Sequence, residues 1–248
     1  MSDEPSAEPE QFRRPGLTRR RLLLGSCAAA VLGAGAAIAE PHLRSGVQAV
    51  VPPPLRPGGP STPHAASVLN GSFDSAARKA STGWSIAYPP GAKAGDALPV
   101  LLVLHGRSDD YRAALGSHGL GGFLAQAVAR GTAPFALVAV DGGDHDYWHP
   151  RTTGADAQAM LVDEFLPLLA SRGLEIDRFA VGGWSMGGYG ALLLAERLGH
   201  RRIAAIAMDS PAIWTRASET APGAFDGRQD FLEHDVLRRI SPVRSIPV

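Results

Sequence analysis

Residues 178–199 read RFAVGGWSMGGYGALLLAERLG, and this stretch decides the fold. Its first residues, Arg178–Gly182, predict a strand, and residues 186–198 predict a helix that ends at Gly199. Between them lies the pattern G-x-S-x-G, here Gly183-Trp184-Ser185-Met186-Gly187. The glycines suit a turn too tight for side chains at the flanking positions. Such a turn places the Ser185 oxygen at a helix N-terminus, where free N–H groups favour developing negative charge.

Two other interpretations of this turn exist. In the first, a Gly-rich connection uses Ser185 only as the N-cap of the helix. In the second, the turn is a phosphate-binding loop, but the pattern G-x-x-x-x-G-K-[ST] with its Lys is absent. Ser185 is therefore the candidate nucleophile, and the N-cap role is the alternative.

The rest of the chain alternates between strand and helix patterns. Short apolar runs predict strands at Trp84–Tyr88, Val100–Leu104, Phe135–Val140 and Ile203–Met208. Helical spacing predicts helices at 122–130, 155–170 and 229–239, and the second presents Met160, Leu161, Phe165, Leu168 and Leu169 on one face. Alternation of this kind predicts an α/β domain with a mostly parallel sheet flanked by helices.

Polar or Gly-rich residues follow three of the predicted strands. They are His105–Asp110, Asp141–Asp144 and the turn around Ser185. In an open α/β sheet, ligands bind beyond the carboxyl ends of the strands. The sequence therefore predicts a site where these three segments meet.

Three segments, LPVLLVLHGRSDD (98–110), DGGDHDYWHP (141–150) and GWSMGGYGALLLAERLG (183–199), together resemble the esterase D-type family of serine α/β-hydrolases. Its members include S-formylglutathione hydrolases, feruloyl-type esterases and mycolyltransferases. The resemblance covers roughly residues 82–248. It implies the α/β-hydrolase fold and hydrolysis of acyl esters through an acyl-Ser185 intermediate, with no metal or organic cofactor.

The resemblance also implies roles for other residues. The N–H groups of Met186 and Arg107 would form the oxyanion hole, and Tyr147 and Trp148 would contact substrate. His105 is expected to shape the loop rather than to act as the base. An acyltransferase that uses a sugar hydroxyl of an envelope glycolipid, in place of water, is the alternative activity.

The general base and its acid are not evident in this chain. In this fold they follow the nucleophile in the order acid, then His. The resemblance implies that both, together with the last strands, lie beyond Val248, so the chain looks truncated relative to the family. Asp209 and His234 keep the right order and are the candidate substitutes. The further alternative is a catalytically inactive hydrolase or a binding protein.

Composition limits the partners. Lys plus Arg and Asp plus Glu each number 24, so there is no basic excess to neutralise nucleic-acid phosphates. Cys27 is the one cysteine, which excludes disulfides within the chain and Cys-based zinc sites. We expect a monomer that acts on a small-molecule or lipid ester.

The N-terminal segment is typical of an export signal. Arg19-Arg20-Arg21 precede an apolar, small-residue stretch that ends at Ala37-Ile38-Ala39, which resembles a twin-arginine (Tat) signal with its cleavage site. We expect a signal at 1–39, a Pro-rich linker at 40–67 and the catalytic domain at 68–248. The protein would be extracellular, periplasmic or associated with the envelope, and only the uncleaved signal would meet the membrane. An uncleaved anchor and lipidation of Cys27 are the alternatives.

Overall fold

The computed structural model describes residues 66–248. The expected signal at 1–39 and nearly all of the linker lie outside the described residues, so both stay predictions. Among residues 66–248, no helix is long and apolar enough to cross a bilayer.

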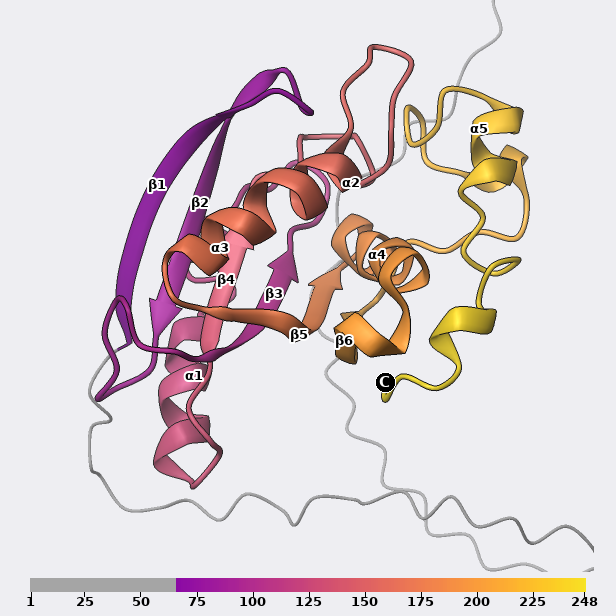
Figure 1. Ribbon diagram of the computed structural model, residues 1–248. Coiled ribbons are helices and arrows are strands. Elements are labelled where there is room, and N and C mark those ends of the chain that lie inside the picture. The colour runs from indigo at the N-terminus through magenta and orange to yellow at the C-terminus, as the bar shows by residue number, and fades with distance from the viewer. Residues whose placement is uncertain (1–65) are drawn as a thin grey trace, which may run out of the picture. The chain divides into compact units, whose positions relative to one another are not determined.

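Six strands form one mixed sheet in the order β1-β2-β4-β3-β5-β6 (Figure 1). They span Ser67–Ser75 (β1), Ala80–Tyr88 (β2), Pro99–Leu104 (β3), Ala136–Val140 (β4), Glu175–Trp184 (β5) and Ile203–Asp209 (β6). The pairs β1/β2 and β2/β4 are antiparallel, whereas β4/β3, β3/β5 and β5/β6 are parallel. After β3 the chain adds β4 on one side and β5 on the other, so the strand order reverses at β3. A reversal of this kind opens a crevice at the carboxyl ends of the strands.

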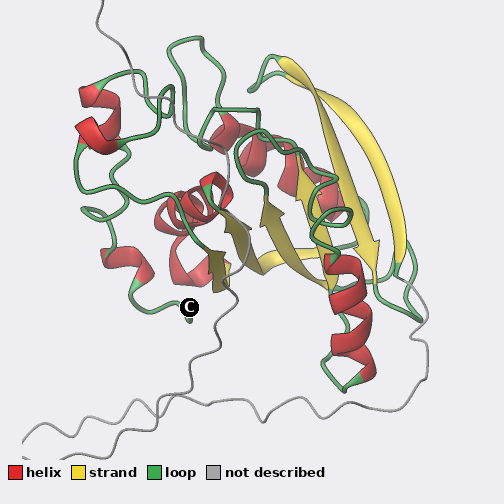
Figure 2. Cartoon of the chain, turned by 180° about the vertical axis from the view of Figure 1, so that it is seen from behind, coloured by secondary structure: helices red, strands yellow, loops and turns green. Residues whose placement is uncertain are grey.

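Helices cover both faces of the sheet. They are α1 (Leu120–Ala129), α2 (Ala157–Ala159), α3 (Leu166–Ser171), α4 (Met186–Arg202) and α5 (Arg228–Glu233). Helix α1 lies on one face, and α2, α3 and α4 lie on the other (Figures 1 and 2). Side chains of β4 alternate between two cores accordingly: Val138 packs into the larger one and Leu137 into the smaller. The continuous apolar run of β4 therefore reflects burial on both faces.

A π-helical turn, Met160–Phe165, joins α2 to α3. Within it, the Glu164 carboxylate accepts hydrogen bonds from the Ser75 hydroxyl and from the Ala77 N–H. The turn thus ties this helical segment to the end of β1. The amphipathic helix predicted at 155–170 is confirmed in position, and Met160, Leu161, Phe165 and Leu169 are buried as expected.

Two elements differ from the sequence prediction. Strand β1 carries no prediction, because seven of its nine residues are polar, small or exposed and its pairing with β2 is a tertiary feature. The helix predicted at 229–239 ends at Glu233. There the Asp235 carboxylate accepts from the N–H groups of Leu237 and Arg238, which offers the backbone an alternative to the helix.

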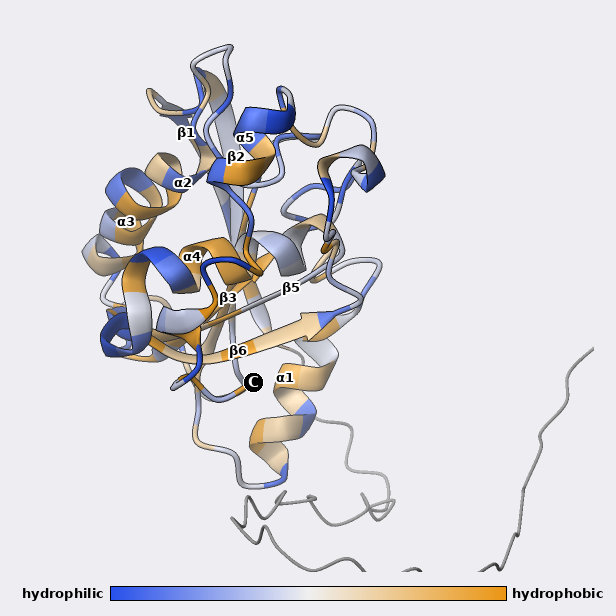
Figure 3. Cartoon of the chain, turned by 90° about the vertical axis from the view of Figure 1, so that its right-hand side faces the viewer, coloured by the Kyte–Doolittle hydropathy of each residue, from blue (hydrophilic) through white to orange (hydrophobic). Residues whose placement is uncertain are grey.

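Strand β6 is the outermost strand among residues 66–248. Figure 3 shows it hydrophobic along most of its length. The C-terminal residues lie beside this strand: the Ile206 N–H donates to the Pro247 carbonyl over 2.9 Å, and Ile246 is buried. This backbone hydrogen bond joins the C-terminal residues to the middle of the outer edge of β6.

Candidate active site

Ser185 occupies a strained turn between β5 and α4. Its φ of 51° and ψ of −117° lie outside the helical and extended regions. Its N–H donates to the Asp209 carbonyl (3.0 Å), and its carbonyl accepts from Tyr189 (3.1 Å) and Ala212 (2.9 Å). Three chain segments thus hold this backbone in place, which sustains a strain of order 1–3 kcal/mol. The side chain of Ser185 makes no cap hydrogen bond, so the N-cap alternative is wrong.

Glycine is required on both sides of Ser185. A Cβ at Gly183 would lie 2.5 Å from the Leu104 carbonyl oxygen, and a Cβ at Gly187 would overlap the same oxygen. A Cβ at Gly188 would press on Pro211 at 2.9 Å. The turn therefore packs directly against the backbone at the end of β3, as the G-x-S-x-G pattern predicts.

The two expected oxyanion donors follow neighbouring strands. Arg107 comes three residues after β3, Met186 comes after β5, and the two strands pair as far as Leu104 and Gly183. Among residues 66–248, neither N–H donates to a carbonyl of a turn or loop. Both N–H groups are thus available to a ligand oxygen near Ser185.

His105 is a structural residue, as expected. It is 1% exposed, and its Nε2 accepts from the Gly142 N–H over 2.9 Å. Nδ1 must then carry the proton, which it donates to the Gly106 carbonyl at 2.8 Å. The Asp141 carboxylate lies 3.6 Å from Nε2, too far for a hydrogen bond. With both nitrogens engaged, His105 cannot accept a proton from Ser185.

The structure contradicts the expected role of Trp148. Its side chain is fully buried, and a Cβ at Gly142 or at Gly190 would overlap its indole ring. Its Nε1 donates to the His105 carbonyl at 3.3 Å. The prediction that Trp148 contacts substrate is therefore wrong, because the ring fills the interior below the site.

Tyr147 belongs to a buried aromatic cluster. It is 3% exposed, and its backbone, like that of Trp148, has positive φ. Its ring lies 5.5 Å from Trp214 and 6.1 Å from Tyr189, between centroids. Burial is the main cause that raises the pKa of the Tyr147 phenol. Contact of Tyr147 with substrate stays a prediction.

The expected pairing of Asp209 with His234 is not found. The Asp209 carboxylate accepts from the Ser210 hydroxyl at 2.9 Å, at the exposed end of β6. His234 is half-buried rather than on the surface, and its Nδ1 lies 2.8 Å from Asp230 Oδ1. Asp230 stands one helical turn before His234, so the local helix, not β6, supplies the partner carboxylate.

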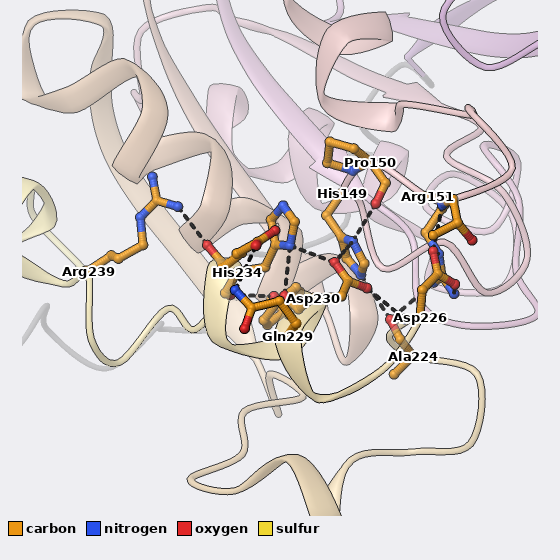
Figure 4. A network of polar contacts seen from close by, with 12 residues as sticks. His149, Pro150, Arg151, Ala224, Asp226, Gln229, Asp230, His234 and Arg239 are labelled. Atoms are coloured by element: carbon orange, nitrogen blue, oxygen red, sulfur yellow. Dashed lines mark hydrogen bonds and ion pairs between the residues drawn. The ribbon is translucent and has the colours of Figure 1, made fainter.

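Sequence reasoning missed a second group of titratable residues, His149, Asp230 and His234 (Figure 4). The rings of His149 and His234 stack with centroids 4.6 Å apart. Burial lowers the pKa of His149, so this imidazole is neutral at neutral pH. The Tyr189 hydroxyl donates to the His234 carbonyl at 2.6 Å, which connects this group to the helix that begins after Ser185.

The sheet with its reversal of strand order, its flanking helices and its strained Ser185 defines the class of α/β-hydrolases. Residues 75–241 match the profile of a family described as "Putative esterase". This match covers more than half of the chain, and the protein belongs to that family.

Solved structures agree on the fold. A ferulic acid esterase superposes with a TM-score of 0.59 at 20% identity, over 71% of each chain. An S-formylglutathione hydrolase from Agrobacterium tumefaciens gives 0.57 at 15% identity, over 74% of this chain and 73% of the other. A fluorophosphonate-binding serine hydrolase from Staphylococcus aureus gives 0.57 at 15%, over 74% and 77%. A search among curated proteins finds no match. The predicted esterase family and α/β-hydrolase fold are confirmed.

Proposed function

We propose that this protein is an exported serine esterase that cleaves small-molecule or lipid carboxylic esters through an acyl-Ser185 intermediate. The observation that carries the proposal is the strained Ser185 backbone at the junction of β5 and α4. Strain at a single residue held by neighbouring segments is typical of a residue that must be presented for chemistry. Membership in an esterase family and the hydrolase-type neighbours support ester hydrolysis.

The proposed reaction has two steps. The Ser185 hydroxyl attacks the ester carbonyl carbon, and its proton passes to a general base. The N–H groups of Met186 and Arg107 would donate to the oxyanion that forms. The base gives the Ser185 proton to the leaving alcohol. Water then attacks the acyl-serine and gives its proton to the base, which returns it to Ser185 as the acid is released. A stable acyl-enzyme is thus the species that distinguishes this mechanism from direct attack by water.

Activation of Ser185 is the step to test, because its side chain needs a base. Two histidines have partners other than Ser185: His105 bonds to Gly106 and Gly142, and His234 bonds to Asp230. A fluorophosphonate reacts rapidly only with an activated serine. We would label the full chain and locate the adduct by mass spectrometry, with Ser185→Ala and His234→Ala as variants.

Rapid labelling of Ser185 that Ser185→Ala abolishes would support the esterase. If His234→Ala also abolished it while the protein stayed folded by circular dichroism, His234 would be the base. A folded chain that does not label would overturn the proposal and would favour the inactive or binding protein instead. Added sugar acceptors would divert the acyl group in the alternative transferase.

Export rests on the sequence before residue 40. The Tat pathway requires its paired arginines, so Arg19→Lys with Arg20→Lys would retain the protein inside the cell. Fractionation of cells that express either form measures this. Equal export of the double variant would contradict the Tat route.

A further inference from the structure

We infer that His149, Asp230 and His234 form a divalent-metal site that takes Zn²⁺. Two imidazole nitrogens and one carboxylate oxygen are a donor set that suits zinc. One ligand atom from each residue lies within 4.8 Å of the other two. The single cysteine excludes only zinc sites built from cysteines, and this site uses none. The proposal departs from the expectation that no metal is required.

The distances suit a single small ion. His234 Nδ1 and His149 Nδ1 lie 2.8 and 3.6 Å from Asp230 Oδ1. Ligands at about 2.0–2.1 Å around a tetrahedral ion would be about 3.3 Å apart. The observed distances lie on either side of this value, so small rotations of the side chains would complete the geometry.

Neighbouring groups already orient the ligand atoms. His149 Nε2 lies 2.9 Å from the Ala224 carbonyl oxygen, and Nδ1 lies 2.9 Å from that of Pro150. In the tautomer that donates through Nε2, Nδ1 keeps a lone pair for a metal. The Asp226 N–H donates to Asp230 Oδ2 at 2.6 Å, so Oδ1 is the oxygen that faces both imidazoles. These hydrogen bonds orient two of the three ligands, and bonds of this kind to the far side of a ligand are a regular feature of protein metal sites.

The oxygen atoms around His149 Nδ1 are compatible with a bound cation in the tautomer that donates through Nε2. The Pro150 carbonyl oxygen lies 2.9 Å from Nδ1, on the same side as Asp230 Oδ1. If the ring donates through Nε2, the lone pair of Nδ1 points toward the Pro150 carbonyl oxygen and Asp230 Oδ1, which are also electron-rich. A cation between them would remove this repulsion, and the Pro150 carbonyl would be in reach as a further ligand.

The site is enclosed but accessible. The His149 side chain is fully buried, whereas those of Asp230 and His234 are 16% and 19% exposed. An ion would enter past His234 and would link the loop after β4 to α5. An ion pair between Arg151 and Asp226, 2.6 Å long, already joins this loop to the segment just before α5. The metal would therefore hold in place the loop that carries Tyr147 and Trp148.

Zinc binding is measured on the full chain after removal of metals with a chelator, by titration against a chromophoric zinc indicator. We expect one equivalent of tightly bound zinc and a rise in Tm with zinc concentration. Asp230→Asn and His234→Gln should weaken binding at least tenfold. His145→Gln is the matched control, because His145 lies in the same loop and pairs with Asp144 instead.

Both variants change exposed or half-buried groups, and circular dichroism checks that each stays folded. Absence of saturable zinc binding by the folded wild type would overturn the proposal. So would binding that Asp230→Asn and His234→Gln leave intact, or that His145→Gln weakens equally. The readout needs no enzymatic activity, so it stands apart from the test of Ser185.

Discussion

The N–H of Gly142 donates to Nε2 of His105 over 2.9 Å and thereby joins the loop after β4 to the loop after β3. Both residues are buried. A histidine directly after a strand, in a chain with a candidate serine nucleophile, invites assignment as the base. The hydrogen bond gives it a different role, since Nε2 accepts a backbone proton and holds two strand-end loops together.

His105→Ala should destabilise the fold. The variant leaves the buried Gly142 N–H without its acceptor, which costs about 1–3 kcal/mol, and it opens a cavity. Chemical denaturation followed by circular dichroism measures the change in free energy of unfolding. The exposed His200 is the control, and His200→Ala should change it by less than about 0.5 kcal/mol. Equal effects of the two variants would contradict the structural role.

Gly187→Ala should prevent the turn at Ser185 from forming. Its Cβ would overlap the Leu104 carbonyl oxygen, and backbone on both sides leaves no room to yield. We expect a loss of several kcal/mol or no folded protein, by the overpacking argument. Gly122→Ala in α1 is the opposite case, because a Cβ there meets nothing within 4 Å. That variant should stabilise the protein by about 0.5–1 kcal/mol, measured as a rise in Tm.

Tyr189→Phe should cost about 0.5–1.5 kcal/mol, because the buried hydroxyl donates to the His234 carbonyl at 2.6 Å. Tyr88→Phe is the matched change at a second buried tyrosine. Its hydroxyl finds no hydrogen-bond partner among the described residues. Removal of an unpaired buried hydroxyl should be neutral or stabilising. Urea denaturation of both variants separates the two cases, and similar losses would contradict this account.

The stability should fall as the pH rises from about 4.5 to above 7, because of Glu196. Burial raises the pKa of this carboxyl from 4.5 to about 7; nearby Asp235 adds to the rise, and Arg239 opposes it. The folded state therefore holds a proton that the unfolded state has already released. The contribution is complete below pH 4.5 and is lost as the pH rises through 7, by up to about 3 kcal/mol.

Glu196→Gln should flatten this part of the stability profile, since a neutral amide has no proton to lose. The measurement is the free energy of unfolding at several pH values between 4 and 9. Glu175→Gln is the control, because the same change is made at an exposed glutamate. A profile in which Glu196→Gln falls as steeply as the wild type would refute the assignment.

Sequence patterns predicted the features that depend on neighbouring residues in the chain. The turn at Ser185 follows from a glycine on each side and from the change of periodicity between β5 and α4. The apolar run Phe135–Val140 predicted a buried strand, and β4 confirms it. Strand β1 lacked such a signal, since its pairing with β2 depends on a neighbour in space.

The rest of the site depends on contacts between distant segments. Trp148 is enclosed because Gly142 and Gly190 leave room for its ring, and no pattern around residue 148 indicates this. His149 lies in the loop after β4 and Asp230 lies in α5, and no spacing rule in the sequence connects them. The partner of His234 was misassigned because Asp209 follows a strand and precedes His234 in the chain order expected of acid and base. The local helix instead supplies Asp230, one turn before His234.

The π-helical turn at Met160–Phe165 has a consequence for sequence drift in this segment. It accommodates one residue more than a regular α-helix would need to join the same two ends. Deletion of that residue would rotate the flanking helical segments by about 100° relative to each other. Either Glu164 would lose its hydrogen bond with Ser75, or Leu169 would leave the hydrophobic core. A relative with a regular helix here should therefore have one residue fewer in this segment. An alignment without that gap would pair each residue of the segment with the neighbour of its true counterpart.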